Sequence, residues 1–93
     1  MVNQYLTLVF MREAPKTPEG ALRLKQGAKI REYRKFNKLT QEQLGKACGV
    51  SKAAVSQWEN GESSPRSMLQ VRIAQELRFP WNVVFGLDSE SAA

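Results

Sequence analysis

The sequence predicts an all-helical fold of five helices, and three observations support this prediction. Apolar residues recur at the spacing of amphipathic helices through most of residues 19–85. Residues that typically begin or end helices, such as Thr40, Gly49 and Ser51, separate these apolar segments. The 93 residues, of which 42% are hydrophobic and 25% charged, have the length and composition of one small globular domain.

The first helix is expected over about residues 19–36, where Leu22, Ile30 and Tyr33 recur near helical spacing. Pro15 and Pro18 are expected to break the chain before this helix begins. Glycine has low helix propensity, so residue 27 should loosen the middle of the helix. Asparagine tolerates the left-handed conformation, so residue 37 is expected to end it.

Two short helices are expected next, over about Gln41–Cys48 and Lys52–Glu59, joined by a tight turn. Thr40 begins a capping-box pattern, in which its hydroxyl and the side chain three residues later satisfy each other's backbone amides. Gly49 stands where a positive φ is needed to end the first of these helices. Ser51 is a good N-cap for the second.

The last two helices are expected near Ser67–Leu77 and Trp81–Phe85, and the shorter one should stop at Gly86. The expected core stripe of the longer one is Leu69, Ile73 and Leu77, with Met68 or Ala74 beside it. The chain is thereby divided into an N-terminal extension (1–18), a helical domain (19–86) and a flexible tail (87–93).

Residues 5–11 differ from the rest because they are rich in β-branched and aromatic residues and have strand propensity. A lone strand is not stable by itself. The segment must therefore pair with a second copy, dock on the domain, bind another protein or stay disordered.

Positive charge is concentrated in one part of the chain. There are 14 Lys and Arg residues against 9 Asp and Glu, a net charge of +5. Seven cations between residues 23 and 38 are opposed only by Glu32; they are Arg23, Lys25, Lys29, Arg31, Arg34, Lys35 and Lys38. A merely basic protein is one interpretation, and a polyanionic partner, bound with release of counterions, is the other.

The composition also argues against several functions. The sequence has no histidine and one cysteine, so we expect no metal site, no cofactor and no enzymatic activity. The cysteine, Cys48, cannot form an internal disulfide and is expected to be a small buried hydrophobe, which fits a reducing cytoplasm. The apolar run at residues 5–11 is too short to span a membrane.

The helix expected over Lys52–Glu59 has two different faces. At 100° per residue, Lys52, Ala53, Ser56, Gln57 and Asn60 lie within roughly 140° of one another. Apolar residues occupy the opposite side. A small polar face of this kind is suited to lie in the major groove of DNA and to contact base edges, although an ordinary solvated helix face has the same pattern.

The segment from about residue 27 to residue 86 resembles the Cro/repressor-type helix-turn-helix domain of phage repressors and related bacterial (XRE-like) regulators. The matching residues are Ile30, Arg31 and Arg34, the runs 39–45, 49–51 and 55–61, Pro65, Ile73, Ala74 and Leu77. The resemblance implies a five-helix lambda-repressor-like fold that binds operator DNA as a two-fold dimer. The turn after Leu77 departs from the family pattern, being one residue shorter and carrying Arg78.

Roles for individual residues follow from the same resemblance. The major-groove residues are implied to be Ser51, Lys52, Ala53, Ser56 and Gln57, and the phosphate contacts Gln41, Asn60 and Arg66. Arg34 and Glu59 match a structural ion pair. The candidates for a dimer contact are Trp81, Val84 and Phe85, which could equally well seal the core.

We therefore expect a sequence-specific transcriptional regulator, most simply a small Cro-like or prophage-type repressor that binds a palindromic operator as a homodimer. A compact chain with no large second domain resembles such a repressor more than a two-domain one. The alternative is an antitoxin-type module that binds a partner protein through residues 5–11 and regulates itself through the same DNA-binding fold. Either protein would act in the cytoplasm, associated with the nucleoid.

Overall fold

The computed structural model describes residues 17–86, and this part of the chain holds five α-helices and no strand. In chain order the helices are α2 (Pro18–Phe36), α3 (Gln41–Cys48), α4 (Lys52–Glu59), α5 (Ser67–Leu77) and α6 (Trp81–Phe85). All five predicted helices are thereby confirmed. The expected strand at residues 5–11 and the expected tail at residues 87–93 lie outside the described residues.

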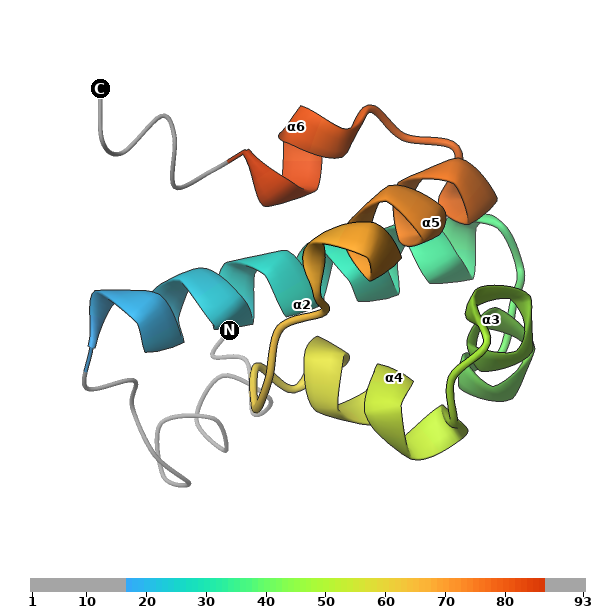
Figure 1. Ribbon diagram of the computed structural model, residues 1–93, viewed down its shortest axis with the longest axis horizontal. Coiled ribbons are helices and arrows are strands. Elements are labelled where there is room, and N and C mark those ends of the chain that lie inside the picture. The colour runs from blue at the N-terminus through green and yellow to red at the C-terminus, as the bar shows by residue number, and fades with distance from the viewer. Residues whose placement is uncertain (1–16, 87–93) are drawn as a thin grey trace, which may run out of the picture.

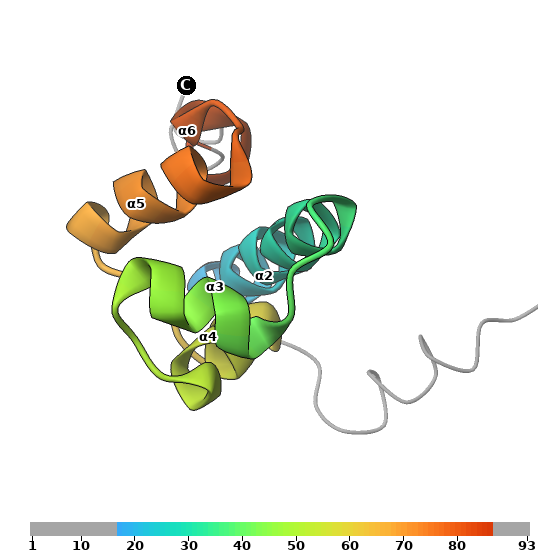
Figure 2. The ribbon, with the colours of Figure 1, turned by 90° about the vertical axis from the view of Figure 1, so that its right-hand side faces the viewer.

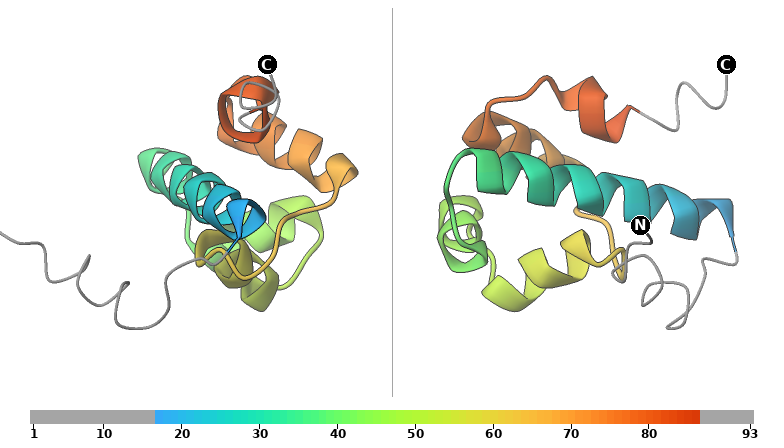
Figure 3. Two further views of the ribbon diagram at one scale, coloured as in Figure 1. Left: turned by 90° about the vertical axis from the view of Figure 1, so that its left-hand side faces the viewer. Right: turned by 180° about the vertical axis from the view of Figure 1, so that it is seen from behind.

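In the view of Figure 1 the long helix α2 lies between α4 below it and α6 above it, and it packs against both. α3 packs against both α4 and α5, and α5 also packs against α6, so the helices surround a shared core with α2 on one side of it (Figures 2 and 3). α3 and α4 are short and follow each other in the sequence. Their relative orientation therefore depends on the turn between them and on the contacts that α2 makes with them.

The two ends of α2 differ from their prediction. Pro18 does not break the chain before the helix but occupies its first position, where a missing N–H costs nothing. Thr17 caps this end by accepting a hydrogen bond from the amide of Gly20 at 3.0 Å. The expectation of a left-handed Asn37 is wrong, because its φ is −85° and the left-handed residue is Lys38, at φ 60°. Asn37 keeps its conformation because its side-chain nitrogen, Nδ2, donates to two main-chain carbonyls, that of Tyr33 on α2 and that of Leu77 on α5.

The turn between α3 and α4 has the predicted chemistry. The Thr40 hydroxyl accepts from the amide of Gln43 at 3.0 Å, and the Gln43 side chain accepts from the amide of Thr40 at 2.8 Å, which completes the capping box. Gly49 has a φ of 75°, the left-handed conformation that glycine adopts without strain. Ser51 caps α4 by accepting from the amide of Ala54 at 3.1 Å. Local hydrogen bonds therefore fix both ends of the turn.

A single apolar core joins the five helices. Its buried members are Ile30, Leu44, Cys48, Val55, Trp58, Ile73, Ala74, Leu77, Phe79, Val84 and Phe85. The predicted stripe of α5 is confirmed for Ile73 and Leu77, and Leu69 is partly buried against the same core. Of the two residues expected beside that stripe, Ala74 is buried but Met68 is 83% exposed. Cys48 is buried as expected, and burial together with the charge of Glu76 raises the pKa of its thiol.

The candidates for a dimer contact on α6 need correction. Val84 and Phe85 are buried, so they seal the core instead of forming an outward apolar patch. Phe79, in the turn before α6, carries this packing further, since its ring centroid lies 4.7 Å from that of Tyr33 and 6.1 Å from that of Phe85. Only Trp81 among the three candidates remains substantially exposed, at 42%.

Gly27 marks the closest approach of α2 to α4. A Cβ atom at this position would lie 2.2 Å from the carbonyl oxygen of Trp58 and 2.7 Å from that of Glu59. The expectation that Gly27 loosens α2 is therefore wrong, because the helix continues through it and the missing side chain lets the end of α4 pack directly on the α2 backbone.

The substitution Gly27→Ala tests this crossing. In an ordinary helix interior alanine would raise stability by about 0.8–1 kcal/mol, because of its helix propensity. Here we expect the free energy of unfolding to fall by about 1–3 kcal/mol, because the added methyl forces α2 away from α4. Urea unfolding measures both quantities. Lys25→Ala, on an exposed position of α2, is the control, and a stabilised Gly27→Ala protein would contradict the close crossing.

Candidate nucleic-acid interface

The two faces of α4 have the predicted difference in burial. Val55 and Trp58 are buried in the core, so one face of the helix is fixed against α2 and α3. The outward side carries the residues expected to face DNA: Ser51, Lys52, Ala53 and Gln57 are exposed and Ser56 is partly exposed. The outward side is small and polar, and its one charge is that of Lys52. Such a surface can approach a concave, polar partner closely.

At the C-terminal end of α4, the carboxylate of Glu59 is completely buried, and it is surrounded by donors from two other helices. Arg34 on α2 donates to it through Nε at 2.5 Å and through Nη2 at 3.1 Å, which confirms the predicted ion pair. Arg31 donates through Nε at 3.3 Å, and Gln41 at the start of α3 through Nε2 at 3.0 Å. A buried carboxylate is tolerated only when it is paired in this way.

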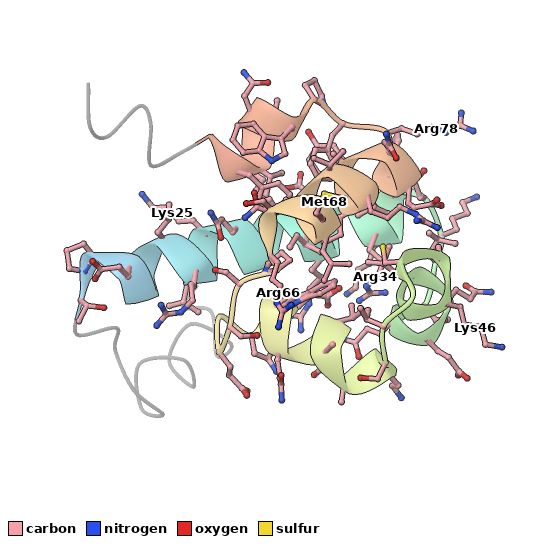
Figure 4. All side chains as sticks on the ribbon, viewed as in Figure 1. Lys25, Arg34, Lys46, Arg66, Met68 and Arg78 are labelled. Atoms are coloured by element: carbon pink, nitrogen blue, oxygen red, sulfur yellow. The ribbon has the colours of Figure 1, made fainter. Side chains whose placement is uncertain are left out.

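The same network reaches the turn between α2 and α3. Arg34 also donates through Nη1 to the carbonyl oxygen of Leu39 at 2.7 Å. In Figure 4 the Arg34 side chain lies inside the molecule, between α2 and the helices below it. One guanidinium and one carboxylate therefore connect α2, the turn that follows it, the start of α3 and the end of α4.

Two members of this network could not be assigned from the resemblance. Arg31 lies three residues before Arg34 and therefore on the same face of α2. This spacing in the sequence could have predicted Arg31 as a second donor to Glu59. Gln41 was expected to contact a phosphate, and no local pattern predicts its bond to a carboxylate 18 residues away. Its side chain is only partly buried at the start of α3, where backbone amides are also unsatisfied.

The protonation of Glu59 reflects its surroundings. Burial acts to raise the pKa of this carboxyl, but the hydrogen bonds from Arg34 and Gln41, with the charge of Arg34, outweigh it. The pKa therefore lies below its ordinary value of 4.5, and the group is ionised at neutral pH. Because its charge is neutralised internally, Glu59 adds little negative potential to the outward face of α4.

The remaining predicted contacts flank this face. Asn60 follows α4, is exposed, and donates weakly to the hydroxyl of Ser56 at 3.4 Å. Arg66 is exposed at the start of α5. Within residues 17–86 neither Arg66 nor Lys52 forms a salt bridge, so both cations can bind an external anion. The exposed Glu62 is the one carboxylate in the loop between α4 and α5.

Other kinds of site find no support in the described part of the chain. Residues 17–86 contain no group of three or more His, Cys, Asp or Glu side chains placed to hold a metal ion. No helix among them is both long and apolar enough to cross a membrane.

Comparison with known proteins gives a consistent result. Residues 30–82 match a protein family described as helix-turn-helix. The repressor protein C2 of Salmonella phage P22 is 40% identical over 52 residues, which are 56% of this chain and 24% of that protein. The HTH-type transcriptional regulator DicA of Escherichia coli K12 is 39% identical over 61 residues, which are 64% of this chain and 45% of that regulator. The chain thus spans less than half the length of either relative.

A solved structure has a similar fold. The crystal structure of the P22 c2 repressor in complex with a synthetic operator superposes with a TM-score of 0.62 and 36% sequence identity. The match covers 63% of this chain and 89% of that one.

Acid unfolding tests the role of Glu59. Because its pKa is lowered in the folded state, its ionisation stabilises the fold fully above the unfolded pKa, and this contribution is lost as the pH falls through the folded-state pKa. We expect the free energy of unfolding of the wild type to drop between about pH 5 and about pH 3 and that of Glu59→Gln to drop less.

Urea titrations at several pH values within this range provide the measurement. Glu62→Gln removes an exposed carboxylate from the neighbouring loop and controls for the change in net charge. Identical pH dependence for Glu59→Gln and the wild type would mean that the network does not hold an ionised carboxylate.

Proposed function

This chain belongs to the Cro/repressor-type helix-turn-helix family, and from this premise we propose that it is a sequence-specific, DNA-binding transcriptional regulator. More narrowly, we propose a small Cro-like or prophage-type repressor that binds a palindromic operator as a homodimer. Its α4 helices lie in the major groove, and repression follows because the occupied operator excludes other proteins. Such a protein acts in the cytoplasm, where the DNA is.

The observation that carries this proposal is the outward face of α4. Its polar side chains are exposed and small, while the opposite face is locked into the core by Val55 and Trp58. A bulky face would hold the helix away from base edges, whereas this one lets the backbone of α4 approach them. The P22 c2 repressor, whose fold is similar, was crystallised in complex with a synthetic operator, which supports DNA as the partner here.

The exposed residues divide by chemistry. Lys52 is the only cation on the face, and its ammonium can donate to O6 and N7 of a guanine. Ala53 can pack on a thymine methyl, while Ser51, Ser56 and Gln57 offer donors and acceptors to base edges. Asn60 and Arg66 flank the face and reach the phosphates, as do the amides at the start of α3 beside Gln41.

A two-fold dimer is suited to a palindromic operator, because each copy meets the same half-site. Two copies of α4 must then lie about 34 Å apart, one turn of the DNA helix, to enter successive major grooves. Trp81 is retained as a dimer contact because its ring is exposed at the start of α6 and is held in place by a hydrogen bond from Nε1 to Gln70 at 3.1 Å.

Selection of bound sites from random duplex DNA tests this function. We expect enrichment of one palindromic sequence, because each half-site meets an identical α4. No enrichment of any sequence would contradict the proposal and favour an antitoxin-type module whose main partner is a protein. Co-purification of a second chain, lost when residues 1–14 are deleted, would identify that module.

A pair of substitutions separates base reading from backbone binding. Lys52→Ala should cost about 1–3 kcal/mol on the selected site and much less on a site whose contacted base pair is changed. Arg66→Ala should weaken binding to all sequences alike, because phosphates carry no sequence information. Affinities for a base-substituted series of the selected site provide the measurement.

Lys46→Ala is the matched control, since Lys46 is exposed and points outward from α3 (Figure 4). It removes the same charge without touching the proposed surface. An equal loss of affinity on every base variant for Lys52→Ala would contradict its role as a base-reading residue.

A further inference from the structure

The first turns of α2 lie outside the family match but contact the proposed DNA-binding unit. The match begins at residue 30, whereas α2 begins at Pro18. These first turns pack on the loop that follows α4. The Ser64 hydroxyl donates to the side-chain oxygen of Gln26 at 3.3 Å. A Cβ atom added at Gly61 would lie only 2.6 Å from Cδ2 of Leu24. The segment therefore does more than lengthen the helix.

Arg23 is the cation that this segment places at the end of α4. Its Nε donates to the carbonyl oxygen of Gly61 at 3.3 Å, directly after Asn60. Arg23 reaches that point because it lies one helical turn before Gly27, on the same stripe of α2, where the helix crosses α4 most closely. The residue is only partly buried, and its hydrogen bond to Gly61 defines the position of the side chain.

The guanidinium of Arg23 has capacity for another ligand. Among residues 17–86 it forms no salt bridge, and its only hydrogen bond is the one through Nε. The two terminal nitrogens are thus available as a planar fork, the geometry that binds a phosphate through two parallel hydrogen bonds.

Arg23 offsets the negative charge at the end of α4, which would otherwise repel a DNA backbone. The C-terminal end of α4 carries the negative pole of the helix dipole, and the exposed Glu62 adds a full negative charge nearby. Both repel a DNA backbone that follows the groove past Asn60. Arg23 places a positive charge at that point. It comes from α2, which precedes α4 in the sequence, whereas Arg66 lies at the start of α5, which follows it.

We propose that Arg23 is a further phosphate-binding residue, contributed by a part of α2 outside the family match, and that it extends the DNA contact beyond the end of α4. This inference rests on the proposed DNA-binding function. It does not extend to every cation of α2, because Lys25 points away from α4 (Figure 4) and Lys29 pairs with Glu32 at 3.5 Å.

The dependence of affinity on salt tests the inference with a mixed-sequence duplex of about 30 base pairs, which requires no knowledge of the operator. Losing one phosphate contact lowers the slope of log affinity against log salt by about 0.9 for each bound copy of the chain. Between about 50 and about 200 mM salt, Arg23→Gln should therefore lose about 3.5-fold less affinity per copy than the wild type.

Lys25→Gln removes the same charge from the other face of α2 and should keep the wild-type slope. Arg23→Lys should also keep it, because the charge remains. Urea unfolding of the three variants, recorded in parallel, identifies any loss of affinity that follows from a loss of folded protein.

Equal slopes for Arg23→Gln, Lys25→Gln and the wild type would overturn the inference while leaving the proposed function intact. Equal reductions in slope for Arg23→Gln and Lys25→Gln would also overturn it, since they would reflect net charge alone. A wild-type protein that binds neither this duplex nor any selected site would instead overturn the proposed function, and the inference with it.

Discussion

The buried carboxylate of Glu59 is the constraint on which the rest of this structure depends. A carboxylate without water must be matched by donors in defined positions, and removing one partner of such a pair typically costs about 3–5 kcal/mol. Here the donors come from α2 and from the first residue of α3, while the carboxylate belongs to the last residue of α4. Three helices can satisfy it only in one relative arrangement, which is the arrangement that presents the polar face of α4.

Close backbone packing acts together with this network. At Gly27 the backbone of α2 meets the carbonyls at the end of α4, and at Gly45 a Cβ would lie 2.7 Å from the carbonyl oxygen of Val50 in the turn. α4 is thus held at its end by α2, and the turn before it is held by α3. Since these contacts use inward-facing groups, the outward side chains are left free to meet a partner. The division between Glu59, which is internal, and Lys52, which is external, follows from this geometry.

The sequence predicts those features whose cause is local. Thr40 and Ser51 each cap a backbone amide three residues later, and the left-handed Gly49 depends only on its own residue type. The helix bounds follow from these local features. Features that depend on contacts between distant segments were predicted less well. Gly27 appears as a weak helix former until the carbonyls of α4 are placed beside it, and the sequence leaves open whether Val84 forms a dimer contact or seals the core until α6 is packed. For the same reason the ion pair between Arg34 and Glu59 required a family resemblance, and the bond from Gln41 was not predicted at all.

A double-mutant cycle on Arg34 and Glu59 tests the central claim most directly. The free energies of unfolding of the wild type, Arg34→Gln, Glu59→Gln and the double variant give the energy by which the two side chains depend on each other. If the buried carboxylate organises the three helices, each single variant is strongly destabilised and the double variant loses much less than the two losses combined. The coupling should then reach about 2–3 kcal/mol. Losses that simply add, to within about 0.5 kcal/mol, would show that the helices are held by apolar packing and that the ion pair is incidental.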